Sequence, residues 1–166
     1  ATLYSGTFMG ARGNSGVILS QFFKGFAQGL DGRADFGGED LARACNLAKE
    51  NAYLSVANPV EGTILTVIAS VAEATREAVD SASDLNTVLQ IASDRARETV
   101  AKTTEMLPVL REAGVVDAGG QGLAVILEAM RRSAAGEDDV GADFDIQVPD
   151  ITPLAPASVS DDFFSA

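Results

Sequence analysis

The stretch Gly10-Ala11-Arg12-Gly13-Asn14-Ser15-Gly16 places three glycines directly before an apolar run with helical spacing. The apolar positions of that run are Val17, Leu19, Phe22, Phe23, Phe26 and Leu30. A glycine-rich turn that leads into a helix gathers free backbone N–H groups at the positive end of the helix dipole. Such a turn is typical of an anion site, most often for phosphate. The same pattern also fits an ordinary tight loop followed by a capped helix.

Three side chains of this stretch could act on an anion. We expect Asn14 or Ser15 to cap the helix, and the Ser15 hydroxyl could also bind a phosphate or a metal-bound water. Arg12 is the one cation in the loop, and it either pairs with a phosphate or stays at the surface. The stretch matches neither familiar nucleotide fingerprint, because it lacks the Lys-Ser/Thr ending of the P-loop and no strand precedes it.

The composition is that of one domain with a substantial core. The chain has 166 residues, of which 46% are hydrophobic, and no apolar stretch approaches membrane-spanning length. Histidine is absent, which removes the commonest general base, so any metal is expected to be a hard cation such as Mg²⁺ on carboxylates. Cys45 is the only cysteine, and we expect it to be a small core residue of a cytoplasmic protein.

The net charge of −12 is distributed unevenly. No Lys or Arg follows Arg132, whereas eight acidic residues do. Because no basic stripe is present, duplex nucleic acid is not expected as a partner. We interpret residues 136–166 as an acidic linker toward a following domain, with one strand-like run at 144–148, and residues 1–135 as a helical domain. A solvated loop is expected to contain Asp31, Asp35, Glu39 and Asp40.

Apolar periodicity predicts an all-α fold, an antiparallel helical bundle. The expected helices span 14–30, 39–56, 62–80, 84–106 and 120–134. We expect Ser83 to cap the fourth helix and Pro108 to end or kink it, with a short turn continuing to Glu112. The positions expected to face inward, besides the first run, are Leu41, Ala44, Cys45, Ala48, Ala52, Val56, Ile64, Leu65, Ile68, Val71, Ala72, Val79, Leu85, Val88, Leu89, Ala92, Ala96, Met106, Leu123, Ile126, Leu127 and Met130. We interpret the phenylalanines of the first helix as core and interface residues rather than an acyl site.

Polar loops at 10–16, 58–63 and 114–122 each precede an odd-numbered helix. In an up-and-down bundle these loops lie at one end, so three helix N-termini would face a single spot and favour a polyanion. Two acids in these loops have simpler explanations: Asp117 could cap the last helix, and Glu61 could cap the third helix rather than act in catalysis.

Three ordered motifs resemble the N-terminal domain of fatty acid kinase A, which is related to the nucleotide-binding L subunit of dihydroxyacetone kinase. The motifs occupy residues 10–21, 59–65 and 114–123, and the resemblance covers about residues 1–135. It implies an antiparallel helical barrel that binds ATP or ADP at one end. By family role the 10–16 loop cradles phosphates, Thr63 lies near the nucleotide, and Asp117 with two glycines forms part of the rim. The implied site residues are Gly10, Arg12, Gly13, Asn14, Ser15, Gly16, Thr63, Asp117, Gly119 and Gly120; no catalytic residue is assigned.

The resemblance leaves three functions open. The first is a kinase for a fatty acid carboxylate that a separate fatty-acid-binding protein presents, with an acyl phosphate as product. The second is a dihydroxyacetone kinase L subunit that phosphorylates a small sugar on a partner subunit. The third is a non-enzymatic helical interaction module, for example a homodimer. The family's Pro-Asp-Gly-Asp-Thr-Gly loop, whose aspartates hold Mg²⁺, is absent from this sequence. We therefore expect an N-terminally incomplete chain that is inactive as a kinase by itself.

Overall fold

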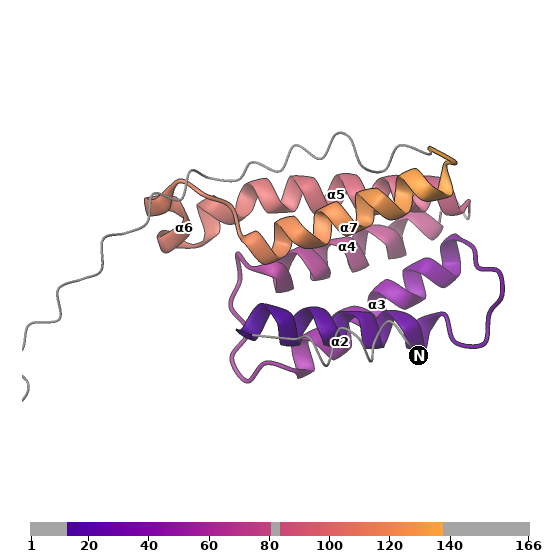
Figure 1. Cartoon of the computed structure of the whole chain (residues 1–166), viewed down its shortest axis with the longest axis horizontal. Helices are drawn as coiled ribbons and strands as arrows, with labels where there is room; N and C mark the ends of the chain where they lie inside the picture. Colours follow the sequence, from indigo (N-terminus) through magenta and orange to yellow (C-terminus); the bar gives the residue numbers. More distant parts are fainter. Residues whose placement is uncertain (1–12, 81–83, 138–166) are drawn as a thin grey trace, which may run out of the picture.

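The computed structural model describes residues 13–80 and 84–137, and every regular element within those ranges is a helix (Figure 1). In chain order the helices are α2 (Gly13–Gly29), α3 (Gly38–Leu54), α4 (Ile64–Val79), α5 (Leu85–Met106), α6 (Pro108–Ala113) and α7 (Ala118–Ala134). The predicted all-α fold is confirmed. The strand-like run at 144–148 lies outside the described residues. Over the same ranges, no helix combines the length and the apolar character that crossing a membrane requires.

Helix α4 is at the centre of the packing. It contacts α3 and α5 along its length and also touches α7, and ten of its residues are buried. Figure 1 shows α4 between the α2 and α3 pair and the α5 and α7 pair. The bundle therefore has one continuous core, to which all the long helices contribute apolar side chains.

Most of the predicted core positions are confirmed. Leu41, Ile68, Val88 and Leu127 are almost completely buried, and Cys45 is buried as a core residue. Two predictions are wrong: Val17 and Met106 are 43% and 45% exposed.

Val17 lies on α2, which packs mainly against α3, so the helix buries only part of its surface. Met106 is the last residue of α5 and lies beside the loop at Gly62 rather than between two long helices. Both exceptions come from helix edges and ends, which a periodicity pattern does not distinguish from helix centres.

Helices α2 and α3 approach closely at two glycines. A methyl group at Gly25 would stand 2.3 Å from the carbonyl oxygen of Leu47, and one at Gly29 would stand 2.3 Å from Ala44 Cα. Because real side chains do not approach backbone atoms so closely, only glycine allows this contact. The Arg43 guanidinium then donates to the Gly29 carbonyl at 2.7 Å and satisfies an acceptor at the end of α2.

The helix boundaries differ from the prediction by one or two residues, but three predicted caps are wrong. Helix α2 begins at Gly13, so Asn14 and Ser15 lie inside its first turn instead of capping it. Asp84, not Ser83, caps α5 by accepting from the Thr87 N–H at 2.9 Å; Ser83 lies outside the described residues. Thr63, not Glu61, is the N-cap of α4. Pro108 begins the short helix α6, as expected after the end of α5.

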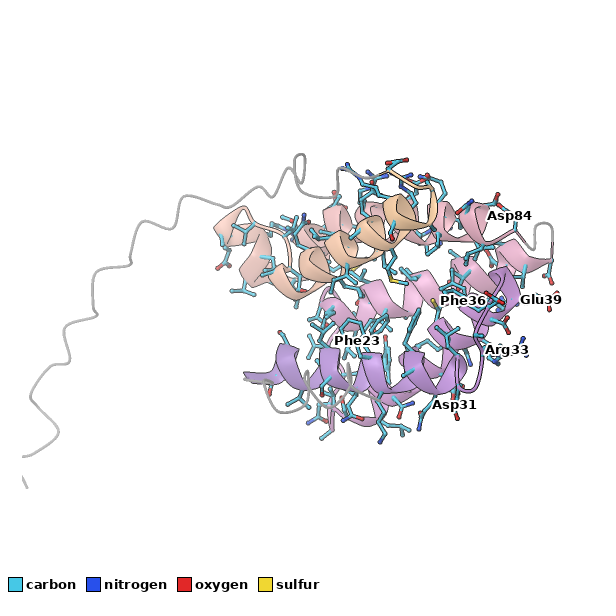
Figure 2. All side chains as sticks on the ribbon, turned by 45° about the vertical axis from the view of Figure 1, so that its right-hand side comes forward. Phe23, Asp31, Arg33, Phe36, Glu39 and Asp84 are labelled. Carbon is cyan, nitrogen blue, oxygen red and sulfur yellow. The ribbon has the colours of Figure 1, made fainter. Side chains whose placement is uncertain are left out.

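The acidic residues between α2 and α3 do not all form a solvated loop. Figure 2 shows Asp31 and Glu39 at the end of the bundle that also holds Asp84, and these side chains are exposed. Asp40 corrects the prediction, because it is only 8% exposed and forms ion pairs with Arg33 and Arg43. The Gly37 N–H also donates to Asp40, and this bond contributes most to holding the pKa of the carboxyl below its ordinary value.

Candidate functional site

Three helix N-termini meet at one end of the bundle. Figure 1 shows that α2, α4 and α7 begin at the same end, whereas α3 and α5 begin at the other. A methyl group at Gly119 in α7 would stand 3.3 Å from Ile64 Cβ in α4 and 3.5 Å from Ser15 Oγ in α2. The first turn of α7 therefore lies close to the first turns of both α4 and α2. We call this end, formed by residues 13–16, 63–64 and 117–120, the N-terminal pole.

The first turn of α2 is the open side of the N-terminal pole. Gly13 has a φ of 69°, a conformation that favours glycine, and a methyl group there would meet no described atom within 4 Å. Gly13, Asn14 and Ser15 are exposed, and Gly16 is half-buried. Gly10 and Arg12, the other predicted residues of this loop, lie outside the described residues. The first N–H groups of a helix have no partner within it, and three of the four residues of this turn are exposed.

The 58–63 loop places Thr63 at the start of α4. The Thr63 hydroxyl accepts from the Leu65 N–H at 3.3 Å and donates to the Val60 carbonyl at 2.8 Å, so it holds both the cap and the loop. Gly62 has a φ of 81°, and a methyl group there would stand 2.8 Å from Met106 Cβ. The loop is therefore pressed against the end of α5, which fixes where α4 begins.

A hydrogen-bond network that the sequence analysis did not predict joins this loop to α4 and α3. The Thr66 hydroxyl donates to Glu61 Oε2 at 2.6 Å and accepts from the buried Gly62 N–H at 2.8 Å. The Tyr53 hydroxyl lies 3.4 Å from Glu61 Oε1; burial, followed by the charge of Glu61, raises the pKa of this phenol. The available signal was a threonine inside the apolar run of residues 64–68, because a buried hydroxyl needs partners.

Asp117 caps α7, as expected. Its carboxylate accepts from the Gly120 N–H at 2.7 Å, and its own N–H donates to the buried Thr103 hydroxyl at 3.0 Å. A methyl group at Gly120 would stand 2.9 Å from Val67 Cγ2, so this glycine is required for packing of α7 on α4. Gly119 lies beside α2 and α4, Gly120 lies beside α4 and α5, and Asp117 caps the turn.

A cavity of about 350 Å³ lies between α3 and α4 and adjoins this end of the bundle. It is lined by Asn46, Lys49, Tyr53, Glu61, Thr66, Ala69, Ser70, Ala72, Glu73 and Arg76. Ser15 and Gly119 do not line it, so it is separate from the N-terminal pole. The two share the 58–63 loop: Glu61 reaches the cavity, while Thr63 belongs to the pole.

The described residues do not present a ligand set for Mg²⁺. Within residues 13–80 and 84–137, no group of three or more His, Cys, Asp or Glu side chains is placed to hold a metal ion. The pole itself consists mainly of backbone N–H groups, hydroxyls and one carboxylate that is used for capping. Helix N-termini of this kind favour anions.

Comparison with known proteins identifies the family. The chain matches the DAK2 domain over residues 1–132. It belongs to the DAK2-domain family. This places it among proteins related to the dihydroxyacetone kinase L subunit, as the three motifs indicate.

Among its relatives, an uncharacterized protein of Staphylococcus epidermidis is 42% identical over 136 residues, and the protein YloV of Bacillus subtilis is 39% identical over 137 residues. An uncharacterized protein of Staphylococcus aureus is 40% identical over 136 residues. Each match covers 82% of this chain and 25% of the relative. This DAK2 chain therefore spans about a quarter of the length of those relatives.

Proposed function

We propose that this DAK2 chain is the nucleotide-binding part of an ATP-dependent phosphotransferase, and that the N-terminal pole binds the phosphates of ATP or ADP. The observation that carries the proposal is the proximity of three helix N-termini, because a methyl group at Gly119 would stand 3.3 Å from Ile64 Cβ and 3.5 Å from Ser15 Oγ. Each helix dipole favours a nearby anion by about 0.3–1 kcal/mol. Each first turn also offers backbone N–H groups that have no partner within the helix.

The shape of the pole supports a phosphate ligand. A methyl group at Gly13 would meet no atom of the described residues within 4 Å, which favours a close approach of phosphate oxygens to the backbone there. The Ser15 hydroxyl is exposed in the same turn and can donate to such an oxygen. The charge of the nearby Asp117 carboxylate is partly offset, because it accepts from the Gly120 N–H.

For the full-length protein we propose that the acceptor is a fatty acid carboxylate presented by a separate fatty-acid-binding protein. The γ-phosphoryl group would pass from ATP to the carboxylate oxygen and leave an acyl phosphate and ADP. The support is the resemblance of the motifs at 10–21, 59–65 and 114–123. We propose Mg²⁺ as the companion of ATP in the complete domain, held by aspartates of a loop that this sequence does not contain, and a cytoplasmic location.

The DAK2 match itself favours a second acceptor. Because the family includes dihydroxyacetone kinase subunits, a small sugar on a partner subunit is the alternative substrate. Offering the full-length protein ATP with either a fatty acid and its binding protein or dihydroxyacetone and a sugar-binding subunit separates the two. Formation of ADP with only one acceptor identifies the reaction.

Calorimetric titration with ATP, with and without Mg²⁺, tests nucleotide binding by this chain and by the full-length protein. At 100 times its dissociation constant, ATP should stabilise the folded state by about 2.7 kcal/mol. Ser15→Ala should weaken binding, whereas Ser133→Ala, an exposed site in the last turn of α7, should not. If neither protein binds ATP the proposal is wrong, and a helical interaction module becomes the better description. Equal affinity of wild type and Ser15→Ala would remove α2 from the site.

A further inference from the structure

The network of Glu61, Thr66 and Gly62 joins the loop before α4 to α4 itself. Gly62 and Glu61 belong to the loop before α4, and Thr66 belongs to the first turns of α4 itself. The Thr66 hydroxyl bridges them by accepting from the Gly62 N–H and donating to the Glu61 carboxylate. One hydroxyl thus ties the loop to the helix that it leads into.

The network sets the orientation of the residues that reach the N-terminal pole. Gly62 directly precedes Thr63, the N-cap, and Ile64 follows it beside Gly119. If the Gly62 N–H loses its partner, the peptide group between Glu61 and Gly62 is no longer held by α4, and the glycine after it has no side chain to restrain the loop. The N–H groups of the first turn of α4 would then lose their fixed direction toward the pole.

The direction of the Glu61 carboxylate argues against a reacting role. One oxygen accepts from Thr66, and the other lies 3.4 Å from the Tyr53 hydroxyl, on the side of the α3 and α4 cavity. Neither oxygen is aimed at Ser15 or Gly119, which face each other at the pole. Besides the effect of its charge, Glu61 can therefore act on an anion at the pole through the loop that it holds.

We propose that Glu61 and Thr66 are positioning residues for the nucleotide site, which hold the 58–63 loop so that the N-terminus of α4 faces the bound phosphates. This inference rests on the proposed function. It adds a role to two residues that do not touch the nucleotide. The bond between Thr66 and Glu61 is charge-assisted and short, which makes it the stronger of the contacts that Glu61 forms.

The experiment compares ATP dissociation constants and melting temperatures of matched variants of this chain. Thr66→Val keeps the shape of the side chain but removes the hydroxyl, and we expect the dissociation constant for ATP to rise about tenfold. Thr66→Ser restores the hydroxyl and should bind ATP within about twofold of wild type. Glu61→Ala changes an exposed residue, so it should fold, and it should weaken ATP binding in the same direction.

Two controls separate positioning from stability. Ser93→Ala removes a buried hydrogen bond of 2.8 Å to Glu128, far along α7 from the pole, and should lower the melting temperature without weakening ATP binding. Tyr53→Phe removes only contacts of 3.4 Å and should leave the affinity unchanged. Failure of both the wild-type chain and the full-length protein to bind ATP overturns this inference together with the proposed function. Normal binding by the wild type and by folded Thr66→Val overturns the positioning role alone.

Discussion

The hydroxyl oxygen of Ser15 lies 3.5 Å from the position that a methyl group on Gly119 would occupy. Ser15 belongs to the first turn of α2 and Gly119 to the first turn of α7, so the contact joins the first and last described long helices. Because Gly119 carries no side chain, the two turns approach without a group between them. A side chain larger than hydrogen at position 119 would have to push Ile64 or Ser15 aside.

The conformation of Gly13 leads to a prediction about that pole. Its φ of 69° costs an alanine about 1–2 kcal/mol, although a methyl group would meet no described atom. Gly13→Ala should therefore lower the free energy of unfolding by about that amount and also weaken ATP binding. Gly136→Ala is the matched control, since Gly136 has a φ of 72° and open space beyond α7. In urea titrations Gly136→Ala should lose a similar amount of stability, but it should bind ATP with the affinity of the wild type. Equal ATP affinities of Gly13→Ala and Gly136→Ala would mean that the ligand does not bind at Gly13.

Much of the fold follows from periodicity alone. Buried residues such as Leu41, Ile68 and Leu127 recur at three- and four-residue steps, and the alternation of helix direction predicts that α2, α4 and α7 begin together. The N-cap residues were harder to predict, because several polar residues lie near the start of each helix and only one of them adopts the capping geometry. Thr63 and Asp84 compete with neighbours of similar chemistry, and only the backbone dihedrals decide between them.

The candidate site was only partly predictable for a different reason. Motif spacing identifies which loops meet, but it does not say which side chains face the ligand and which hold the loop. Thr66 lies within an apolar run, and Asp40, in the first turn of α3 rather than in a loop, is buried and paired with Arg33 and Arg43. Such partners are defined by tertiary packing and not by local sequence.

The close approach of α2 and α3 predicts a large effect at Gly25. Its added methyl group would overlap the Leu47 carbonyl oxygen at 2.3 Å, so Gly25→Ala must push two helix backbones apart. We expect a loss of about 2–3 kcal/mol in urea unfolding. Gly122→Ala is the control within a helix, because its methyl group meets no described atom and alanine favours a helix over glycine by about 1 kcal/mol. Similar effects of the two variants would contradict the observed contact between α2 and α3.

The Cys45 thiol should be unreactive in the folded protein. It is 1% exposed, and burial raises the pKa of its thiol to about 12, although a hydrogen bond with Thr75 acts in the opposite direction. Because the thiolate is the reactive form, a disulfide reagent added at pH 8 should label the native protein only through unfolding. The same reagent in denaturant should react at once with one thiol per chain. Rapid labelling of the native protein would show that α3 opens locally.

The final prediction concerns Glu128, which joins α7 to α5. It is 8% exposed, accepts from the Ser93 hydroxyl at 2.8 Å, and contacts Arg131 and Arg132 at 3.0 and 2.9 Å. The hydrogen bond from Arg131 contributes most to lowering the pKa of Glu128 to about 2, while burial opposes it. A carboxyl with a lowered pKa in the folded state stabilises that state above its unfolded pKa, and this stability is lost as the pH falls.

Stability from Glu128 should therefore be complete above pH 5 and disappear between about pH 4.5 and pH 2. The shift corresponds to about 3 kcal/mol, and Glu128→Gln should remove most of this pH dependence because an amide does not titrate. In urea titrations from pH 7 to pH 2, the curves of wild type and Glu128→Gln should differ most at pH 7 and converge at low pH. Glu137→Gln, which alters an exposed partner of Arg131, should change the profile much less. Parallel curves for wild type and Glu128→Gln across the whole range would mean that Glu128 is not held as a paired carboxylate between α5 and α7.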